Sequence, residues 1–174
     1  MKILACLDGT NAEAMGHAAR MFAGAQPLTI GLLTVMDVGP RKDIDRTRER
    51  FWRPALHRQS VIQDMLAAES EASQDILKAG LERWPDAEPL LRQGYPELEI
   101  VNTAADWNAD VILVCPRSEY GAPPSLGPHS VGHVARFVLD HAPCPVMLVR
   151  PPAAGRQAEA GGTGPRPRAG NPPG

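Results

Sequence analysis

Residues of the three types that form a catalytic triad occur in this sequence. Ser118 or Ser130 could serve as a nucleophile, with His133 as the base and Asp8 as the acid, because such chemistry needs a hydroxyl beside a base that a third group orients. The G-x-S-x-G motif that exposes a nucleophilic serine at a sharp turn is missing from the sequence. We therefore expect no catalytic residues in this chain.

Metal and thiol chemistry are also disfavoured. His129 and His133 are four residues apart, which places both on one helix face, but no third ligand follows at a fixed spacing. A surface helix start is the favoured interpretation, and we expect no metal site. Cys115 ends an apolar run, where a packed and inert thiol is more common than a reactive one. Cys6 is expected in the core.

Common phosphate-handling folds lack their signatures here. The sequence has no P-loop and no G-x-G-x-x-G after a strand. A phosphoacceptor domain would need an acidic pair after the first strand and a lysine near the fifth, whereas Asp8 stands alone and no lysine follows Lys78.

The elements that must position these residues follow from hydrophobic periodicity. Five apolar runs predict strands at 2–7, 28–35, 88–93, 111–115 and 145–150. Helices are predicted at 12–22, 60–84, 96–105 and 130–141. Thr10 or Asn11 is expected to cap the first helix through a side-chain oxygen, and His141 to cap the end of the fourth. Three residues of the third helix are expected to face inward, namely Leu98, Val101 and Ala105.

Continuous apolar strands alternating with amphipathic helices predict an α/β fold with a doubly wound, open five-stranded parallel sheet and helices on both faces. Ligands bind such sheets at the carboxyl ends of the strands, where the winding direction reverses. We therefore expect Asp8, the turn after Val35 and residues 115–132 on one rim.

The composition is that of an ordinary globular protein. The chain has 174 residues and a formal net charge of −2, which gives no reason to expect nucleic-acid binding. No apolar run is long enough to predict a membrane span. Three cysteines without a C-x-x-C pair, and an N-terminal segment without signal-peptide features, favour a cytoplasmic protein.

Two segments differ from the rest. Residues 152–174 hold eleven Gly or Pro in 23 positions, which predicts a disordered tail after a domain at 1–151. Residues 39–59 carry seven Lys or Arg against three Asp or Glu. A solvated loop running into a helix is the favoured interpretation of this basic stretch, and a flap over an anionic ligand is the alternative.

Four local patterns, taken in order, resemble the universal stress protein family. Residues 7–10 read L-D-G-T, residues 94–96 read G-Y-P, residues 109–114 read A-D-V-I-L-V, and residues 141–150 read H-A-P-C-P-V-M-L-V-R. The resemblance spans residues 1–151. It implies a strand order of 3-2-1-4-5, dimerisation through the last strand, and ATP or AMP binding in one branch of the family.

The nucleotide-binding branch of that family carries G-x2-G-x9-G-[ST] between the fourth strand and fourth helix, where glycines and helix-start N–H groups hold phosphate. Its glycine positions fall here on Cys115, Ser118 and Gly132, with His133 at the hydroxyl position. Thirteen residues, 119–131, separate the last two glycine positions, where the family has nine. Three of the thirteen are prolines, which donate no N–H.

The resemblance therefore implies a degenerate nucleotide site. By correspondence with the family, Asp8 would meet the adenosine part of a ligand and the Val35 backbone the adenine. The residues expected around a nucleotide are Asp8, Val35, Cys115, Arg117, Ser118, Gly132 and His133. We expect a non-catalytic cytoplasmic regulatory or interaction protein without a cofactor, dimerising through the apolar edge strand at 145–150. The alternative is an ATP- or AMP-binding protein whose loop 119–131 replaces the glycines.

Overall fold

The computed structural model describes residues 1–24, 27–37, 58–116 and 131–150. Its centre is a five-stranded sheet in the order β3-β2-β1-β4-β5, in which all neighbouring strands are parallel. The strands are β1 (Lys2–Cys6), β2 (Thr29–Asp37), β3 (Glu88–Gly94), β4 (Val111–Val114) and β5 (Val146–Leu148). The predicted fold class and the 3-2-1-4-5 order implied by the family resemblance are both confirmed.

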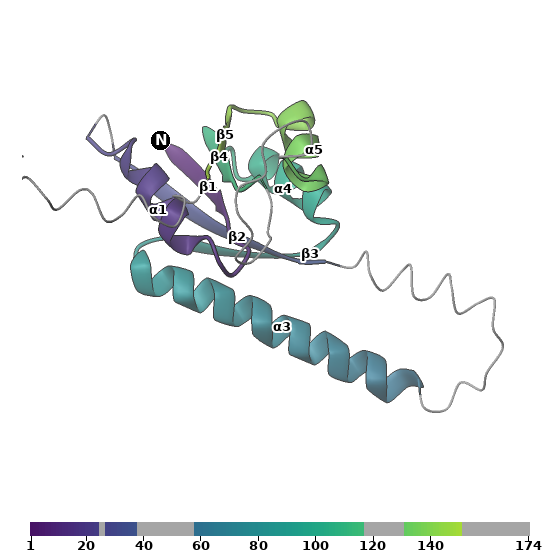
Figure 1. Ribbon diagram of the computed structural model, residues 1–174. Helices are drawn as coiled ribbons and strands as arrows, with labels where there is room; N and C mark the ends of the chain where they lie inside the picture. The colour runs from purple at the N-terminus through teal and green to yellow at the C-terminus, as the bar shows by residue number, and fades with distance from the viewer. Residues whose placement is uncertain (25–26, 38–57, 117–130, 151–174) are drawn as a thin grey trace, which may run out of the picture.

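Helices cover both faces of this sheet (Figure 1). They are α1 (Ala12–Arg20), α3 (Arg58–Arg83), α4 (Pro96–Asp106) and α5 (His133–His141). Helices α1 and α3 pack on one face, and α4 and α5 pack on the other. Each face has its own apolar core, so the chain forms a three-layer sandwich.

The central strand β1 shows why its sequence is apolar without alternation. Ile3, Leu4 and Ala5 are each fully buried. Ile3 and Ala5 belong to the core under α1 and α3, whereas Leu4 and Cys6 belong to the core under α4 and α5. A strand between two helix layers must be apolar on both sides. The prediction that Cys6 is a core residue is confirmed.

The inward face of α4 differs from the predicted one. Ile100, Thr103 and Ala104 are buried, whereas Leu98 is 43% exposed and Ala105 is exposed; Val101 is half-buried against the core. Both sets of positions have helical spacing, so periodicity alone does not choose between them. Ile100 and Ala104 belong to the core between the sheet and this helix layer, so packing against the sheet selects the face that periodicity leaves open.

Several predicted ends also shift. Strand β2 continues to Asp37, two residues past its predicted end at Val35, because it pairs with β3 up to Asp37 opposite Gly94. Helix α5 begins at His133 rather than near 130, after an extended Gly132. The predicted role of His141 is confirmed, since its ring Nδ1–H donates to the carbonyl of Phe137 in the last turn of α5, with Nδ1 and oxygen 2.9 Å apart.

Some predictions concern residues outside the described ranges. The tail at 152–174, most of the basic stretch at 39–59 and the loop from 119 to 130 all lie there. Within the described ranges, no helix has the length and apolar character that crossing a membrane requires.

Candidate functional site

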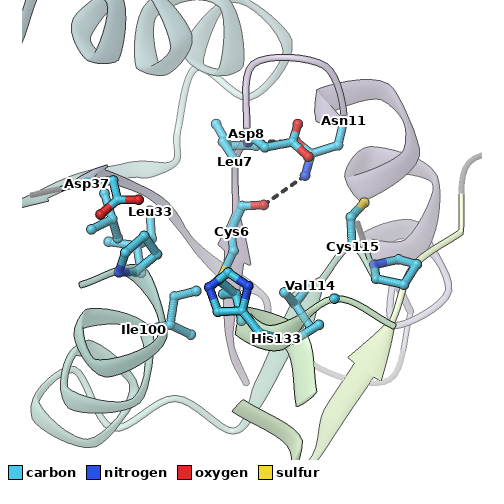
Figure 2. Close-up of a pocket in the computed structure, with 16 residues that line it drawn as sticks. Cys6, Leu7, Asp8, Asn11, Leu33, Asp37, Ile100, Val114, Cys115 and His133 are labelled. Carbon is cyan, nitrogen blue, oxygen red and sulfur yellow. Dashed lines mark hydrogen bonds between the residues drawn. The ribbon is translucent and has the colours of Figure 1, made fainter. Parts of the chain in front are cut away.

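A cavity of about 520 Å³ opens at the carboxyl ends of β1, β2 and β4, beside the starts of α4 and α5 (Figure 2). Its volume lies in the range of small-molecule sites, roughly 300–1,000 Å³. The described lining residues are Cys6, Leu7, Asp8, Asn11, Leu33, Val35, Asp37, Pro96, Ile100, Val114, Cys115, Pro116, Gly132, His133, Val134 and Ala135. This is the rim where the winding reverses between β1 and β4, as expected for a doubly wound sheet.

The structure brings most of the predicted site residues to this pocket. Five of the seven line it, namely Asp8, Val35, Cys115, Gly132 and His133. The other two, Arg117 and Ser118, lie outside the described residues. That any of the seven contacts a ligand stays a prediction.

The turn after β1 fixes the Asp8 carboxylate. Its Oδ1 accepts hydrogen bonds from the backbone N–H and from the hydroxyl of Thr10, each with a donor–acceptor distance of 2.9 Å. Gly9 between them has φ +89°, a conformation that residues with a side chain rarely adopt. Asp8 is only partly buried, so it stands at the pocket wall with one oxygen already held by the turn.

Asn11 is the residue that the sequence-based prediction placed in the wrong role. It precedes α1, yet its side chain makes no capping hydrogen bond to that helix. Instead its Oδ1 accepts from the Asp8 N–H at 3.2 Å, and its Nδ2 donates to the Cys6 carbonyl at 3.0 Å. The side chain is 3% exposed. Asn11 therefore ties the end of β1 to the turn that carries the pocket's acid.

Cys115 occupies the pocket wall just after β4. Burial raises the pKa of its thiol to about 11; a hydrogen bond from Asn11 opposes this rise, and the Asp8 carboxylate adds to it. Burial also raises the pKa of the Cys6 thiol well above its usual range. Both thiols are protonated at neutral pH and are therefore weak nucleophiles, which agrees with the expectation of inert packing.

The start of α5 is tied to the end of β4 by one short hydrogen bond. The backbone N–H of Gly132 donates to the carbonyl of Pro116, with nitrogen and oxygen 2.6 Å apart. Pro116 itself has no N–H. The surviving glycine of the family motif thus directs its N–H at the protein's own backbone.

Two acids are among the described residues that line the pocket. Asp8 and Asp37 both line it, and the lining residues that the structure describes include neither Lys nor Arg. Asp37 was not among the predicted site residues, because the apolar run of β2 ends before it. Its spacing from Val35 could have identified it. Side chains two residues apart in a strand point to the same face, so Asp37 lies on the same face of β2 as Val35.

Metal binding receives no support from the described residues, among which no group of three or more His, Cys, Asp or Glu side chains could hold an ion. His133 lies at the start of α5, and its predicted partner His129 falls outside the described ranges.

Comparison with known proteins identifies the family. Residues 1–150 match the universal stress protein family. The "universal stress protein in QAH/OAS sulfhydrylase 3′ region" of Thermus aquaticus is 33% identical over 148 residues, which are 85% of this chain and 97% of that protein. The chain therefore belongs to the universal stress protein family.

Solved structures with the same fold include two whose sequences are more distant. Universal stress protein UspA from Lactobacillus plantarum is similar with a TM-score of 0.63 and 21% identity, over 86% of this chain and 97% of that one. A universal stress protein family protein from Arabidopsis thaliana with AMP bound is similar with a TM-score of 0.56 and 15% identity, over 86% of this chain and 90% of that one. At these identities the likeness shows the fold.

Proposed function

We propose that this chain is a non-catalytic, cytoplasmic regulatory protein of the universal stress type, in which the phosphate-binding part of the pocket is degenerate. The observation that carries the proposal is the hydrogen bond from Gly132 to Pro116. Phosphate sites at helix starts depend on backbone N–H groups that point at the anion. In this chain the N–H of Gly132 donates to the backbone carbonyl of Pro116. Pro116 itself has no N–H that could bind an anion.

The non-catalytic part of the proposal is supported by the state of the pocket's thiols. Cys6 and Cys115 are the sulfur nucleophiles in the described lining, and burial keeps both protonated near neutral pH. Phosphate release by the purified full-length chain with ATP and magnesium is expected to equal that of buffer. Release proportional to protein concentration, retained after a further purification step, would contradict the proposal.

The degenerate phosphate site is tested by isothermal titration of the full-length chain with ATP and magnesium. We expect no binding tighter than about 1 mM, the affinity that corresponds to roughly 4 kcal/mol. Mass spectrometry of protein purified without added nucleotide should find no adenylate. A copurified nucleotide would overturn the proposal directly.

A second candidate function is AMP or ATP binding in the same pocket. It is favoured by the cavity at Asp8, Val35 and the start of α5, and by the AMP bound to the relative from Arabidopsis thaliana. Sub-millimolar binding that Asp8→Ala abolishes would establish it. Glu13→Ala is the matched control, because Glu13 is an exposed acid on the neighbouring helix α1.

Homodimerisation through β5 is part of the proposal. Strand β5 is an outer strand of the sheet and pairs only with β4 among the described strands. Its three residues, Val146, Met147 and Leu148, are apolar and only partly buried, and an apolar sheet edge favours pairing with another chain. Light scattering should give twice the chain mass of 18.7 kDa. A monomer at high micromolar concentration would contradict the dimer.

A further inference from the structure

We propose that helix α3 sets the shape of the pocket by holding the turn after β1 from behind, so that a movement of α3 is passed to the pocket wall. Ile76 of α3 rests on Gly9 in that turn. Leu7, which precedes the turn, packs against Gly80 of α3. The inference goes beyond the proposed function, because it concerns how the pocket is shaped and is independent of what the pocket binds.

The first contact is between Ile76 and Gly9. A Cβ atom on Gly9 would lie 3.3 Å from both Cγ1 and Cδ1 of Ile76, so the isoleucine side chain lies directly against the α-carbon of the turn. The residues on either side of Gly9 are Asp8 and Thr10, which are hydrogen-bonded to each other. A displacement of Ile76 therefore acts on the middle of the turn that holds the Asp8 carboxylate.

The second contact is between Leu7 and Gly80. A Cβ atom on Gly80 would lie 2.8 Å from Cδ1 of Leu7, so even an alanine at this position would push Leu7 or the helix away. Leu7 is 7% exposed and lines the pocket. Because Ile76 and Gly80 are four residues apart on one face of α3, the same face contacts the chain on both sides of Asp8.

Asn11 connects the turn to Cys115. Its side chain accepts from the Asp8 N–H and donates to the Cys6 carbonyl, and it also hydrogen-bonds to the Cys115 side chain. Burial is the main cause that raises the pKa of the Cys115 thiol to about 11. A shift of the turn would reduce this burial and lower the pKa, and the thiol would then react faster with an electrophile.

Helix α3 is attached to the domain near its C-terminal end. The described apolar side chains of α3 that pack in the core lie between Ile76 and Trp84, and Ile76 is the first of them along the helix. At 1.5 Å per residue, roughly 27 Å of helix precede it, and Figure 1 shows the start of α3 running past the strands. Packed side chains transmit displacement between elements, so the contact with Gly9 lies where movement of the long free part of α3 would reach the core.

The rate at which iodoacetamide labels Cys115 in the full-length chain tests the first contact. Mass spectrometry of the peptides identifies which cysteine is labelled. Ile76→Ala removes both side-chain atoms that touch Gly9, whereas Ile76→Val removes Cδ1 alone. We expect Ile76→Ala to raise the labelling rate of Cys115 near pH 8 by at least about threefold, and Ile76→Val to raise it less.

Leu81→Ala is the matched control for the isoleucine variants. Leu81 packs against the same apolar core as Ile76, but none of its atoms lies within 4 Å of the Cβ position of Gly9. We expect Cys115 in this variant to react at the wild-type rate. Cys6, buried in β1, reports opening of the whole domain, and the partly buried Cys144 reports the activity of the reagent.

Gly80→Ala tests the second contact by pushing on Leu7, and it should also speed the labelling of Cys115. Ala79→Leu is its control, because it adds a larger side chain at the adjacent, exposed position of α3. This control should leave the rate unchanged. Circular dichroism and urea denaturation establish that each variant is folded under the labelling conditions.

The outcomes decide the inference in either direction. Faster labelling at Cys115 alone, in the order wild type, Ile76→Val, Ile76→Ala, supports it. If Ile76→Ala does not fold, Ile76→Val decides. An unchanged rate in the folded Ile76 variants overturns the inference, as does an equal rise in Leu81→Ala. A rise of the same size at Cys6 also overturns it, because the whole domain would then be opening.

Discussion

Asn11 holds the Asp8 turn through both ends of one amide group. Its Oδ1 lies 3.2 Å from the backbone nitrogen of Asp8, and its Nδ2 lies 3.0 Å from the Cys6 carbonyl oxygen. Because the side chain is 3% exposed, water cannot easily replace either bond. The acid at the pocket wall is thus positioned by a buried neighbour from the start of α1.

We predict that Asn11→Ala lowers the free energy of unfolding by about 1–3 kcal/mol, because it leaves a buried carbonyl and a backbone N–H without partners. Urea denaturation followed by circular dichroism measures the change. Asn102→Ala is the matched control, since Asn102 is exposed on α4 and its loss should cost less than about 0.5 kcal/mol. Equal effects of the two substitutions would show that the Asn11 bonds do not stabilise the fold.

The Cys115 thiol should make stability depend on alkaline pH. Its pKa is raised from 9.0 to about 11 in the folded chain, so the unfolded state loses its proton first as pH rises. Below pH 9 the protonated Cys115 thiol contributes its full stabilisation to the fold. This contribution, about 2–3 kcal/mol, is lost as pH rises through about 11. Cys6, whose pKa burial also raises, acts in the same direction.

Cys115→Ala should therefore flatten the fall in stability above pH 9 without abolishing it, because Cys6 remains. Urea denaturation in reducing buffer at a series of pH values compares the slopes. Cys144→Ala is the control: burial raises the pKa of Cys144 too, but that side chain is only partly buried, so its removal should alter the slope less. Parallel curves for the wild-type chain and Cys115→Ala would rule out this contribution.

His141 should stabilise the end of α5. Its Nδ1–H donates to the Phe137 carbonyl at 2.9 Å, and its ring stacks on Phe137 with centroids 4.0 Å apart. We predict that His141→Ala costs up to about 1 kcal/mol, since it removes both the side-chain hydrogen bond to the last turn and the stacking on Phe137. His17→Ala, at an exposed position of α1, should cost less. Thermal melting of both variants measures this, and a larger loss for His17→Ala would refute it.

The fold could be predicted largely because its central strands are buried on both faces. Strands β1 and β4 contain residues that are almost entirely inaccessible, so each appears as an unbroken apolar run. Their order in the sheet came from the family resemblance, because periodicity does not say which strands pair. The orientation of α4 was mispredicted for a related reason, since it depends on contacts with β2 that are distant in sequence.

The site could be predicted where a residue directly follows an apolar run, as Asp8 and Cys115 do. Asn11 was assigned the wrong partner because an asparagine before a helix can either cap the helix or bond elsewhere. The choice was decided by the buried Cys6 carbonyl, which only the folded chain brings near. Asp37 was missed because strand pairing with Gly94, not hydrophobicity, extends β2 to that position.

The close approach of Trp107 to Gly31 gives a test of how α4 is oriented. A Cβ atom at Gly31 would lie 3.0 Å from Cη2 of Trp107 and 3.0 Å from Cδ1 of Leu90. The indole has little freedom to move away, because its Nε1–H donates to Glu88 at 2.9 Å and the Lys2 ammonium lies 4.9 Å from its ring centroid. We predict that Gly31→Ala lowers the free energy of unfolding by about 1–3 kcal/mol through overpacking.

A double-mutant cycle distinguishes this contact from a general intolerance of strand β2 to substitution. Trp107→Phe removes the outer ring of the indole, so Gly31→Ala should cost less in the Trp107→Phe background than in the wild-type chain, by about 0.5 kcal/mol or more. Thr29→Ala, at an exposed position of the same strand, is the control and should cost the same in both backgrounds. If Gly31→Ala were equally destabilising in the two backgrounds, the Trp107 contact would not be the cause, and the orientation of α4 would need another explanation.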